Sequence, residues 1–239
     1  MRLVIVYPLP FDAWPVFCPF AGRFINSFKE FPPGLEDYEL WAVGCWGEPT
    51  PEIRSWFYGT KTRFIPYHDH GCDIGAAQYA ASLCEEPALV LSMTSRCYFH
   101  RSGWGKRFLE AREAQGEGLY GASVSREGGK LHVCTRAYAM DSDLWQSFPH
   151  LVNSRPKGQW FETGQWCLTD WARQQQVKVM QVTWDSASDI EDAHNPVEQG
   201  IYRRNRQTAM LVWDKHTDIF RDASNEERAR LQRMCFEPG

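Results

Sequence analysis

The sequence predicts an α/β domain in which a mostly parallel sheet is flanked by helices. Residues 3–7 and 88–93 are almost entirely apolar, which is typical of strands buried on both faces, and residues 38–43 give another strand. Segments with helical character lie between these strands, and such alternation indicates a parallel sheet. The chain has 239 residues and no evident linker, so we expect one domain.

The first half of the chain supplies further elements. Two phenylalanines four residues apart indicate a short helix around residues 23–28, which the prolines and glycine at 32–34 end. A weaker strand follows at residues 63–66. The alanine-rich stretch at 74–84 predicts a tightly packed helix before the buried strand at 88–93.

The pattern changes after residue 100. Ser102 is expected to cap a helix over residues 104–115. The pair Gly128-Gly129 separates apolar runs at 119–124 and 130–134, and this predicts a hairpin that is added antiparallel to the sheet.

The last third of the chain alternates again. A short helix is expected at residues 141–148, a longer one at 161–174 and a final strand at 177–183. Residues 185–200 are polar and lack periodicity, so we interpret them as a mobile loop. A charged helix begins at Asn225 and covers about 225–236.

Composition excludes few functions but sets the expected compartment. The net charge of -4 carries no global signature for nucleic acid or an anionic membrane. The apolar run at the N-terminus is too short for a signal peptide or a membrane span, so we expect a cytoplasmic protein. The eight cysteines are scattered singly without CxxC spacing, which favours reduced thiols.

Several short motifs occur along the chain in a distinctive order. They are Phe31–Gly34, Cys72–Gln78, Gly118–Gly121 and Glu162–Gly164. In this order, and with the predicted elements, the chain resembles a bacterial and viral group of small glycosyltransferases of the GT-A fold. The resemblance extends from Leu3 to about Ala223 and implies one GT-A-like (Rossmann-like) domain. Its nucleotide-binding half would cover about 1–100 and its acceptor and catalytic half about 101–223.

The resemblance implies a nucleotide-diphosphate sugar donor, with a UDP-sugar as the leading candidate. Open α/β sheets bind ligands beyond the carboxyl ends of their strands, where polar residues are found here. The candidate nucleotide contacts are Tyr7, Asp69, Asp73, Gln78, Thr94, Ser95 and Arg96. Asp73 equally suits a helix N-cap, and Tyr7 equally suits the core.

The usual metal motif of this group is missing. GT-A enzymes carry an Asp-x-Asp motif after the fourth strand, but Met93–Arg96 contains no acid. Binding of Mn²⁺ or Mg²⁺ is therefore in doubt, and cations or amides would have to stabilise the diphosphate. The candidates are Arg96 and, in a second group, Arg203, Arg204 and Gln207, although ordinary surface charge also explains a basic run.

Catalysis by this group implies a carboxylate that deprotonates the acceptor hydroxyl. Glu162 matches it by type and by its expected position at the N-terminus of a helix, and direct displacement would then invert configuration. A plain preference for acids at helix N-termini explains the residue as well.

Aromatic side chains and a histidine are candidates for the acceptor or the sugar. These candidates are His132, Trp166 and Trp184. His132 and His194 are also candidates for a late metal ligand, but a lone histidine is more often structural.

Two classes of function stay open at this point. The first is a glycosyltransferase whose acceptor is a glycan, a small molecule or a hydroxymethylated base in DNA. The second is a catalytically degenerate scaffold that binds a nucleotide or a sugar. A metal hydrolase is a weaker third reading, because no acidic and histidine residues show convincing ligand spacing.

Overall fold

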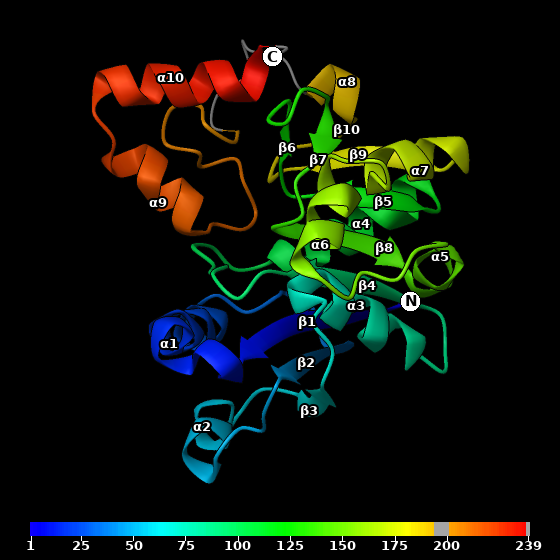
Figure 1. Cartoon of the computed structure of the whole chain (residues 1–239), viewed down its shortest axis with the longest axis vertical. Helices are drawn as coiled ribbons and strands as arrows, with labels where there is room; N and C mark the ends of the chain where they lie inside the picture. Colours follow the sequence, from blue (N-terminus) through cyan, green and yellow to red (C-terminus); the bar gives the residue numbers. More distant parts are fainter. Residues whose placement is uncertain (194–200, 238–239) are drawn as a thin grey trace.

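The mixed α/β architecture expected from the sequence is confirmed by the computed structural model, which describes residues 1–193 and 201–237. The central sheet contains β1 (Arg2–Pro10), β2 (Tyr38–Cys45), β3 (Thr62–Tyr67), β4 (Ala88–Met93), β5 (Gly118–Gly121), β8 (Ala137–Asp141), β9 (Lys178–Val182) and β10 (Ala187–Asp189). Their order is β10-β9-β5-β8-β4-β1-β2-β3 (Figure 1). β1 pairs in parallel with both β2 and β4, whereas β8 runs antiparallel to β4 and β5.

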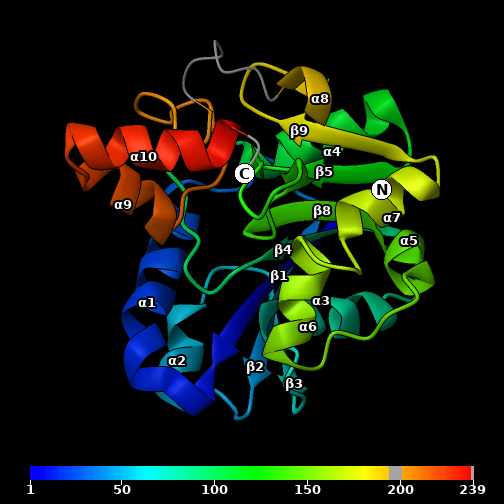
Figure 2. The same ribbon diagram turned by 45° about the horizontal axis from the view of Figure 1, so that its top comes forward.

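Helices cover both faces of the sheet, as Figure 2 shows from a second side. One face carries α1 (Trp14–Glu30), α2 (Pro51–Trp56) and α4 (Trp104–Gln115), and the other carries α3 (Cys72–Ser82), α5 (Ser142–Ser147), α6 (Arg155–Glu162) and α7 (Leu168–Gln174). A 3-10 turn (Phe11–Ala13) precedes α1. The short helix α8 (Ile190–Ala193) follows β10, and α9 (Lys215–Asp222) and α10 (Asn225–Phe236) complete the fold.

β1 shows why the sheet needs helices on both faces. Every residue from Leu3 to Leu9 is buried, and successive side chains point to opposite sides. Val4 and Val6 join the apolar cluster under α3, while Ile5 and Tyr7 join the cluster under α1. The continuous apolar run of the sequence thus reflects burial on two faces.

Two helix predictions were wrong in extent. The helix at 23–28 is the C-terminal part of α1, which begins at Trp14 and contains Pro19 within it. The helix expected at 161–174 is divided into α6 and α7, because Gly164 lies against Trp160, where a Cβ would be 2.6 Å from the Trp160 Cα. Glu162 therefore ends a helix and does not begin one.

The expected cap of α4 is also wrong. Ser102 makes no capping bond, and the residue before the helix is Gly103, whose φ of 94° lies in the left-handed region that glycine tolerates.

The predicted hairpin exists but is not added to the main sheet. β6 (Val124–Ser125) and β7 (His132–Val133) form a separate two-stranded sheet. The main sheet instead gains two other antiparallel strands that were not predicted, β8 beside β4 and β5, and β10 beside β9. Since β8 is inserted between β4 and β5, its N-terminal residue lies beside Met93.

The polar stretch at 185–200 is partly ordered. β10 and α8 cover residues 187–193, and residues 194–200, including His194, lie outside the described residues. The helix α9 was not predicted, although a capping box starts it. The Asp214 carboxylate accepts from the His216 and Thr217 amides at 3.0 Å each, and the Thr217 hydroxyl accepts from the Asp214 amide at 3.2 Å. Among the described helices, none has the length and apolar character to cross a membrane.

Close packing at the start of α3 gives a test of the fold. A Cβ on Gly75 would overlap the Tyr67 hydroxyl and lie 2.5 Å from the Val152 carbonyl oxygen. Gly75→Ala should therefore lower the free energy of unfolding by about 2 kcal/mol. Gly22→Ala in α1 is the matched control, since a Cβ there meets nothing within 4 Å, and it should raise the value by about 0.5 kcal/mol. Urea unfolding of both variants measures the difference, and equal stability would contradict the packing of α3.

Candidate functional site

The strand order reverses between β1 and β4, and this reversal locates the candidate site. From β1 the chain proceeds outward through β2 and β3 and then returns to β4 on the other side of β1. The helix after β1 and the helix before β4 lie on opposite faces of the sheet (Figure 1), and the carboxyl ends of both strands lie side by side at one edge. Ligands of open α/β sheets bind at such a switch point.

Arg96 lies at this edge, between α1 and α3. Its guanidinium lies over the rings of Phe17 and Phe20 in α1, with 4.8 and 5.6 Å to the ring centroids. Its charge also acts on Asp73 in the first turn of α3, on the opposite side. Within the described chain Arg96 forms no hydrogen bond or ion pair, so its N–H donors are available to an anionic ligand.

Asp73 is the carboxylate on the α3 side. Burial raises the pKa of its carboxyl from 3.8 to about 6, although Arg96 acts in the opposite direction. Its interpretation as a helix N-cap is wrong, because Gly71 occupies that position and Asp73 lies inside the helix. A buried carboxyl with a raised pKa beside an arginine is typical of functional sites.

The segment before β8 brings a second arginine to the same edge. Because β8 is antiparallel to β4, its start lies beside the end of β4, and the Thr94 amide donates to the Arg136 carbonyl at 2.8 Å. The Arg136 guanidinium is buried over the Tyr202 ring at 3.7 Å and lies 3.9 Å from the Asp214 carboxylate. Its Nη1 and the Tyr202 hydroxyl have no hydrogen-bond partner among the described residues.

Glu162 faces this segment from the end of α6. Its carboxylate accepts from the Thr135 amide at 3.1 Å and acts electrostatically on Arg136. Burial alone would lower the pKa of Arg136, but Tyr202, Cys134, Asp214 and Glu162 raise it, so the guanidinium stays charged. The expected help from a helix N-terminus is absent, because Glu162 is the last residue of its helix.

A thiol and an imidazole lie beneath these charges. Burial alone would raise the pKa of the Cys134 thiol, but Arg136 and His132 lower it. The His132 ring is 2% exposed, and its Nδ1 lies 2.9 Å from the Lys130 carbonyl oxygen. His132, the expected sugar or acceptor contact, is thus enclosed by the protein in this structure.

Two predicted nucleotide contacts are used inside the protein. Tyr7 is fully buried, stacks on Phe24 with 3.6 Å between ring centroids, and donates to the Ser95 carbonyl at 2.7 Å. Gln78 donates to the His150 carbonyl and accepts from the Val152 amide, at 2.8 Å each. The hydrogen bonds of these two side chains are made within the protein.

Thr94 and Ser95 lie in the turn that follows β4, and their side chains face other protein groups. The Thr94 hydroxyl lies 3.4 Å from the Cys97 sulfur, and Ser95 is 3% exposed. Their backbone, tied to Arg136 and Tyr7, sets the direction of Arg96.

Asp69 lines a cavity to which Asp73 does not contribute. It lines a pocket of about 740 Å³ beside α3 and α5, together with Tyr79, Trp145 and His150. Trp166 does not line this pocket, but its ring stacks on that of His150 with 4.4 Å between the ring centroids. Trp184 belongs to the apolar cluster on the opposite face of the sheet, so Trp166 and Trp184 do not form one sugar site.

The predicted phosphate group is mostly structural. Arg203 is buried, with its guanidinium 3.1 Å from both the Glu127 carboxylate and the Leu231 carbonyl. Gln207 is fully buried and bonds to the Arg203 amide and the Thr217 carbonyl. Arg204 lies over the Phe236 ring at 4.2 Å.

Arg136, Tyr202 and Asp214 were missed by sequence reasoning. No local signal marks them, because they meet only when β8 pairs with β4 and the C-terminal segment folds back over the edge. Across residues 1–193 and 201–237, no three His, Cys, Asp or Glu side chains are arranged to hold a metal ion.

Comparisons with known proteins give distant structural similarities. No family model and no curated protein matches the chain. HddC from Yersinia pseudotuberculosis is 12% identical, with 64% of this chain and 83% of that chain covered and a TM-score of 0.44. S. aureus TarS 1-349 in complex with UDP is 12% identical, with 66% and 53% covered and a TM-score of 0.47.

A third similar structure is the mannosyltransferase PcManGT from Pyrobaculum calidifontis, described in complex with GDP-Man and Mn²⁺. It is 13% identical, with 64% of this chain and 49% of that chain covered and a TM-score of 0.45. The chain thus spans about half of PcManGT and of the TarS fragment. At such values, function has to be inferred from the chain's own residues.

The raised pKa of Asp73 predicts a pH dependence of stability. Between about pH 4 and pH 6 the native state holds a proton that the unfolded chain releases, so the free energy of unfolding falls as pH rises through this window. Asp73→Asn should remove this fall, which amounts to about 1 to 3 kcal/mol, and should be the more stable protein at pH 7. Denaturant unfolding of both proteins from pH 4 to 7 measures the difference, and parallel profiles would show that Asp73 titrates normally.

Proposed function

We propose that the protein transfers a sugar from a nucleotide-diphosphate donor to an acceptor hydroxyl. Two observations at the switch point between β1 and β4 carry this proposal. The turn that carries Arg96 is hydrogen-bonded to the Arg136 carbonyl, and the Glu162 carboxylate acts electrostatically on Arg136. Two guanidiniums can bind a diphosphate, and a carboxylate beside them can accept a proton. Site residues of this kind at this place favour group transfer from a phosphorylated donor.

The diphosphate leaving group would be stabilised by arginines. Arg96 is held by two phenylalanine rings and lacks an anionic partner in the described chain, and Arg136 has an unpaired Nη1. Preorganised cations stabilise developing negative charge because they need no reorganisation during the reaction. The chain would thus use fixed charges where related folds use a metal with an Asp-x-Asp motif. A UDP-sugar is our leading donor.

Glu162 would act as the general base. The Thr135 amide orients one carboxylate oxygen at 3.1 Å, and the carboxylate is half-buried beside Arg136. Removal of the acceptor proton by Glu162 would let the hydroxyl attack the anomeric carbon directly, while the bond to the diphosphate breaks and configuration inverts. The acceptor classes are a glycan, a small molecule and a hydroxymethylated base in DNA.

A nucleotide- or sugar-binding protein without turnover is the second candidate. It is favoured by the Asp214 carboxylate, which lies 3.9 Å from Arg136 and competes with a phosphate for that charge. Such a protein would bind a diphosphate without releasing sugar.

Donor binding can be tested before the acceptor is known. At about 100 times its dissociation constant, the correct nucleoside diphosphate should stabilise the protein by about 2.7 kcal/mol, and EDTA should not abolish the effect. Arg96→Gln should weaken this binding about tenfold or more, while Lys29→Gln in the last turn of α1 should not. Thermal shifts with UDP, GDP, CDP, ADP and dTDP measure both, and equal affinity in Arg96→Gln would exclude Arg96 as a phosphate ligand.

Catalysis is tested at Glu162. The variant Glu162→Gln keeps an oxygen that accepts from Thr135 but cannot take a proton, so transfer should fall about 100-fold or more, with donor affinity changed less than about threefold. Glu113→Gln, on the exposed side of α4, is the control. Release of nucleoside diphosphate with a panel of acceptors is the measurement. Normal turnover in Glu162→Gln would remove it as the base, and binding without turnover in the wild type would favour the second candidate.

A further inference from the structure

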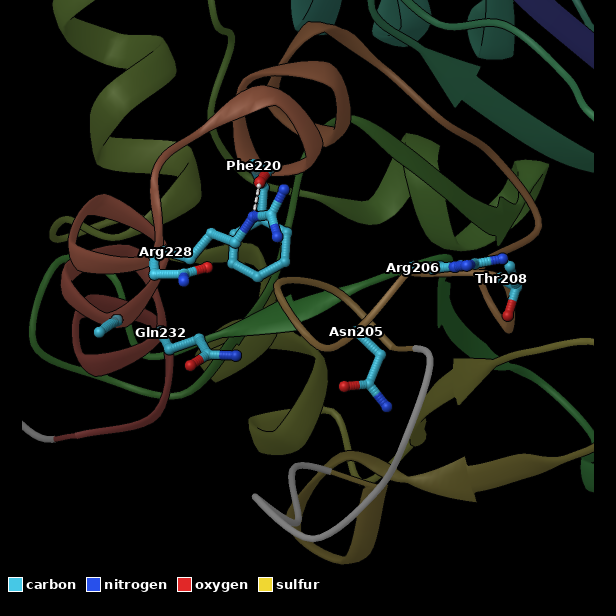
Figure 3. Close-up of a pocket in the computed structure, with 8 residues that line it drawn as sticks. Asn205, Arg206, Thr208, Phe220, Arg228 and Gln232 are labelled. Atoms are coloured by element: carbon cyan, nitrogen blue, oxygen red, sulfur yellow. Dashed lines mark hydrogen bonds between the residues drawn. The ribbon is translucent and has the colours of Figure 1, made fainter.

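A polar pocket of about 730 Å³ lies between the 205–208 loop and the helices α9 and α10 (Figure 3). Two arginines line it, Arg206 and Arg228. Amide and hydroxyl side chains complete the polar lining: Asn205, Asn225, Gln232 and Thr208. No carboxylate occurs among its described lining residues, and the pocket shares no residue with the switch point.

The loop is constrained so that it presents polar residues to this pocket. Arg203, Asn205 and Gln207 have φ values of 56°, 45° and 56°, which non-glycine residues rarely adopt. Such a backbone persists where surrounding contacts hold it. Here Gln207 accepts from the Arg203 amide at 2.8 Å and donates to the Thr217 carbonyl at 3.2 Å. Arg203 and Gln207 therefore point inward, whereas Arg206 and Thr208 are exposed at the pocket.

The two arginines differ in how they are held. Arg228 donates from Nε to the Phe220 carbonyl at 3.0 Å, as the dashed line in Figure 3 shows, and from Nη2 to the Arg221 carbonyl. These carbonyls belong to the last turn of α9, so the guanidinium is fixed against the end of that helix, which lowers the cost of ordering it around a ligand. Arg206 is exposed and makes no hydrogen bond or ion pair with the part of the chain that the structure describes.

We propose that this pocket binds a small phosphorylated polyol, of the class of sugar phosphates. Guanidinium groups match phosphate oxygens in charge and geometry, and no acid among the described lining residues compensates their charge. Amide side chains both donate and accept, which suits the hydroxyl groups of a polyol. The volume falls within the usual range of small-molecule sites. The site is separate from the proposed transfer reaction and does not depend on it.

Titration calorimetry on the full chain tests the proposal, with ribose 5-phosphate, ribose and inorganic phosphate as probes. Ribose 5-phosphate should bind at least about tenfold more tightly than either other probe, because it alone engages both the arginines and the amides. Failure of ribose 5-phosphate to bind at about 10 mM, or equal affinity for inorganic phosphate, would overturn a site for a phosphorylated polyol.

Two variants locate the binding. Arg206→Gln removes one charge and Ala229→Phe fills the pocket without a change of charge; each should weaken ribose 5-phosphate binding at least about tenfold. Arg233→Gln, on the same helix but outside the pocket, should not. Melting temperatures report whether each variant is folded, and Arg206→Gln remains informative if Ala229→Phe is not. Binding that survives Arg206→Gln but is lost in Arg96→Gln would assign the probe to the switch point and refute the proposal.

Discussion

Two hydrogen bonds that fix the turn after β4 position the charged groups of the candidate site. The Tyr7 hydroxyl donates to the Ser95 carbonyl from β1, and the Thr94 amide donates to the Arg136 carbonyl at the start of β8. Because the Tyr7 bond is buried, breaking it would leave an unpaired polar group in the core. Arg96, in the same turn, carries one positive charge of the candidate site, and Arg136 carries the other. The site therefore depends on the correct insertion of β8 beside β4.

The arrangement of charge around this turn favours an anionic ligand. Arg96 is supported by aromatic rings and forms no ion pair with a carboxylate of the described chain, and Arg136 has a buried Nη1 without a hydrogen-bond partner there. A buried cation is costly unless other charges compensate it, and Glu162 and Asp214 supply that compensation. Asp73, by contrast, has a carboxyl whose pKa burial raises to about 6 against the opposing effect of Arg96.

The C-terminal segment joins the two candidate sites through the fold. Asp214 caps α9 and lies near Arg136, while α9 and α10 form the wall of the polar pocket. Gln207 connects the strained loop to α9 through the Thr217 carbonyl. The backbone conformation of the basic run at 203–206 thus directs its arginines differently. Arg203 is buried and ion-paired, and Arg206 lines the pocket. Charge alone could not separate these roles.

The buried strands of the parallel core could be predicted from local sequence, because the apolar runs of β1 and β4 are typical of strands that are covered on both faces. It also marked Thr94–Arg96 as a strand end with polar groups. It did not determine the break between α6 and α7, the cap of α4 or the pairing of β8, since these follow from the contact of Gly164 with Trp160, the left-handed Gly103 and strand register. Local patterns predict elements, whereas Arg96, Arg136 and Glu162 are 26 to 66 positions apart in the sequence, and only tertiary contacts bring their segments together.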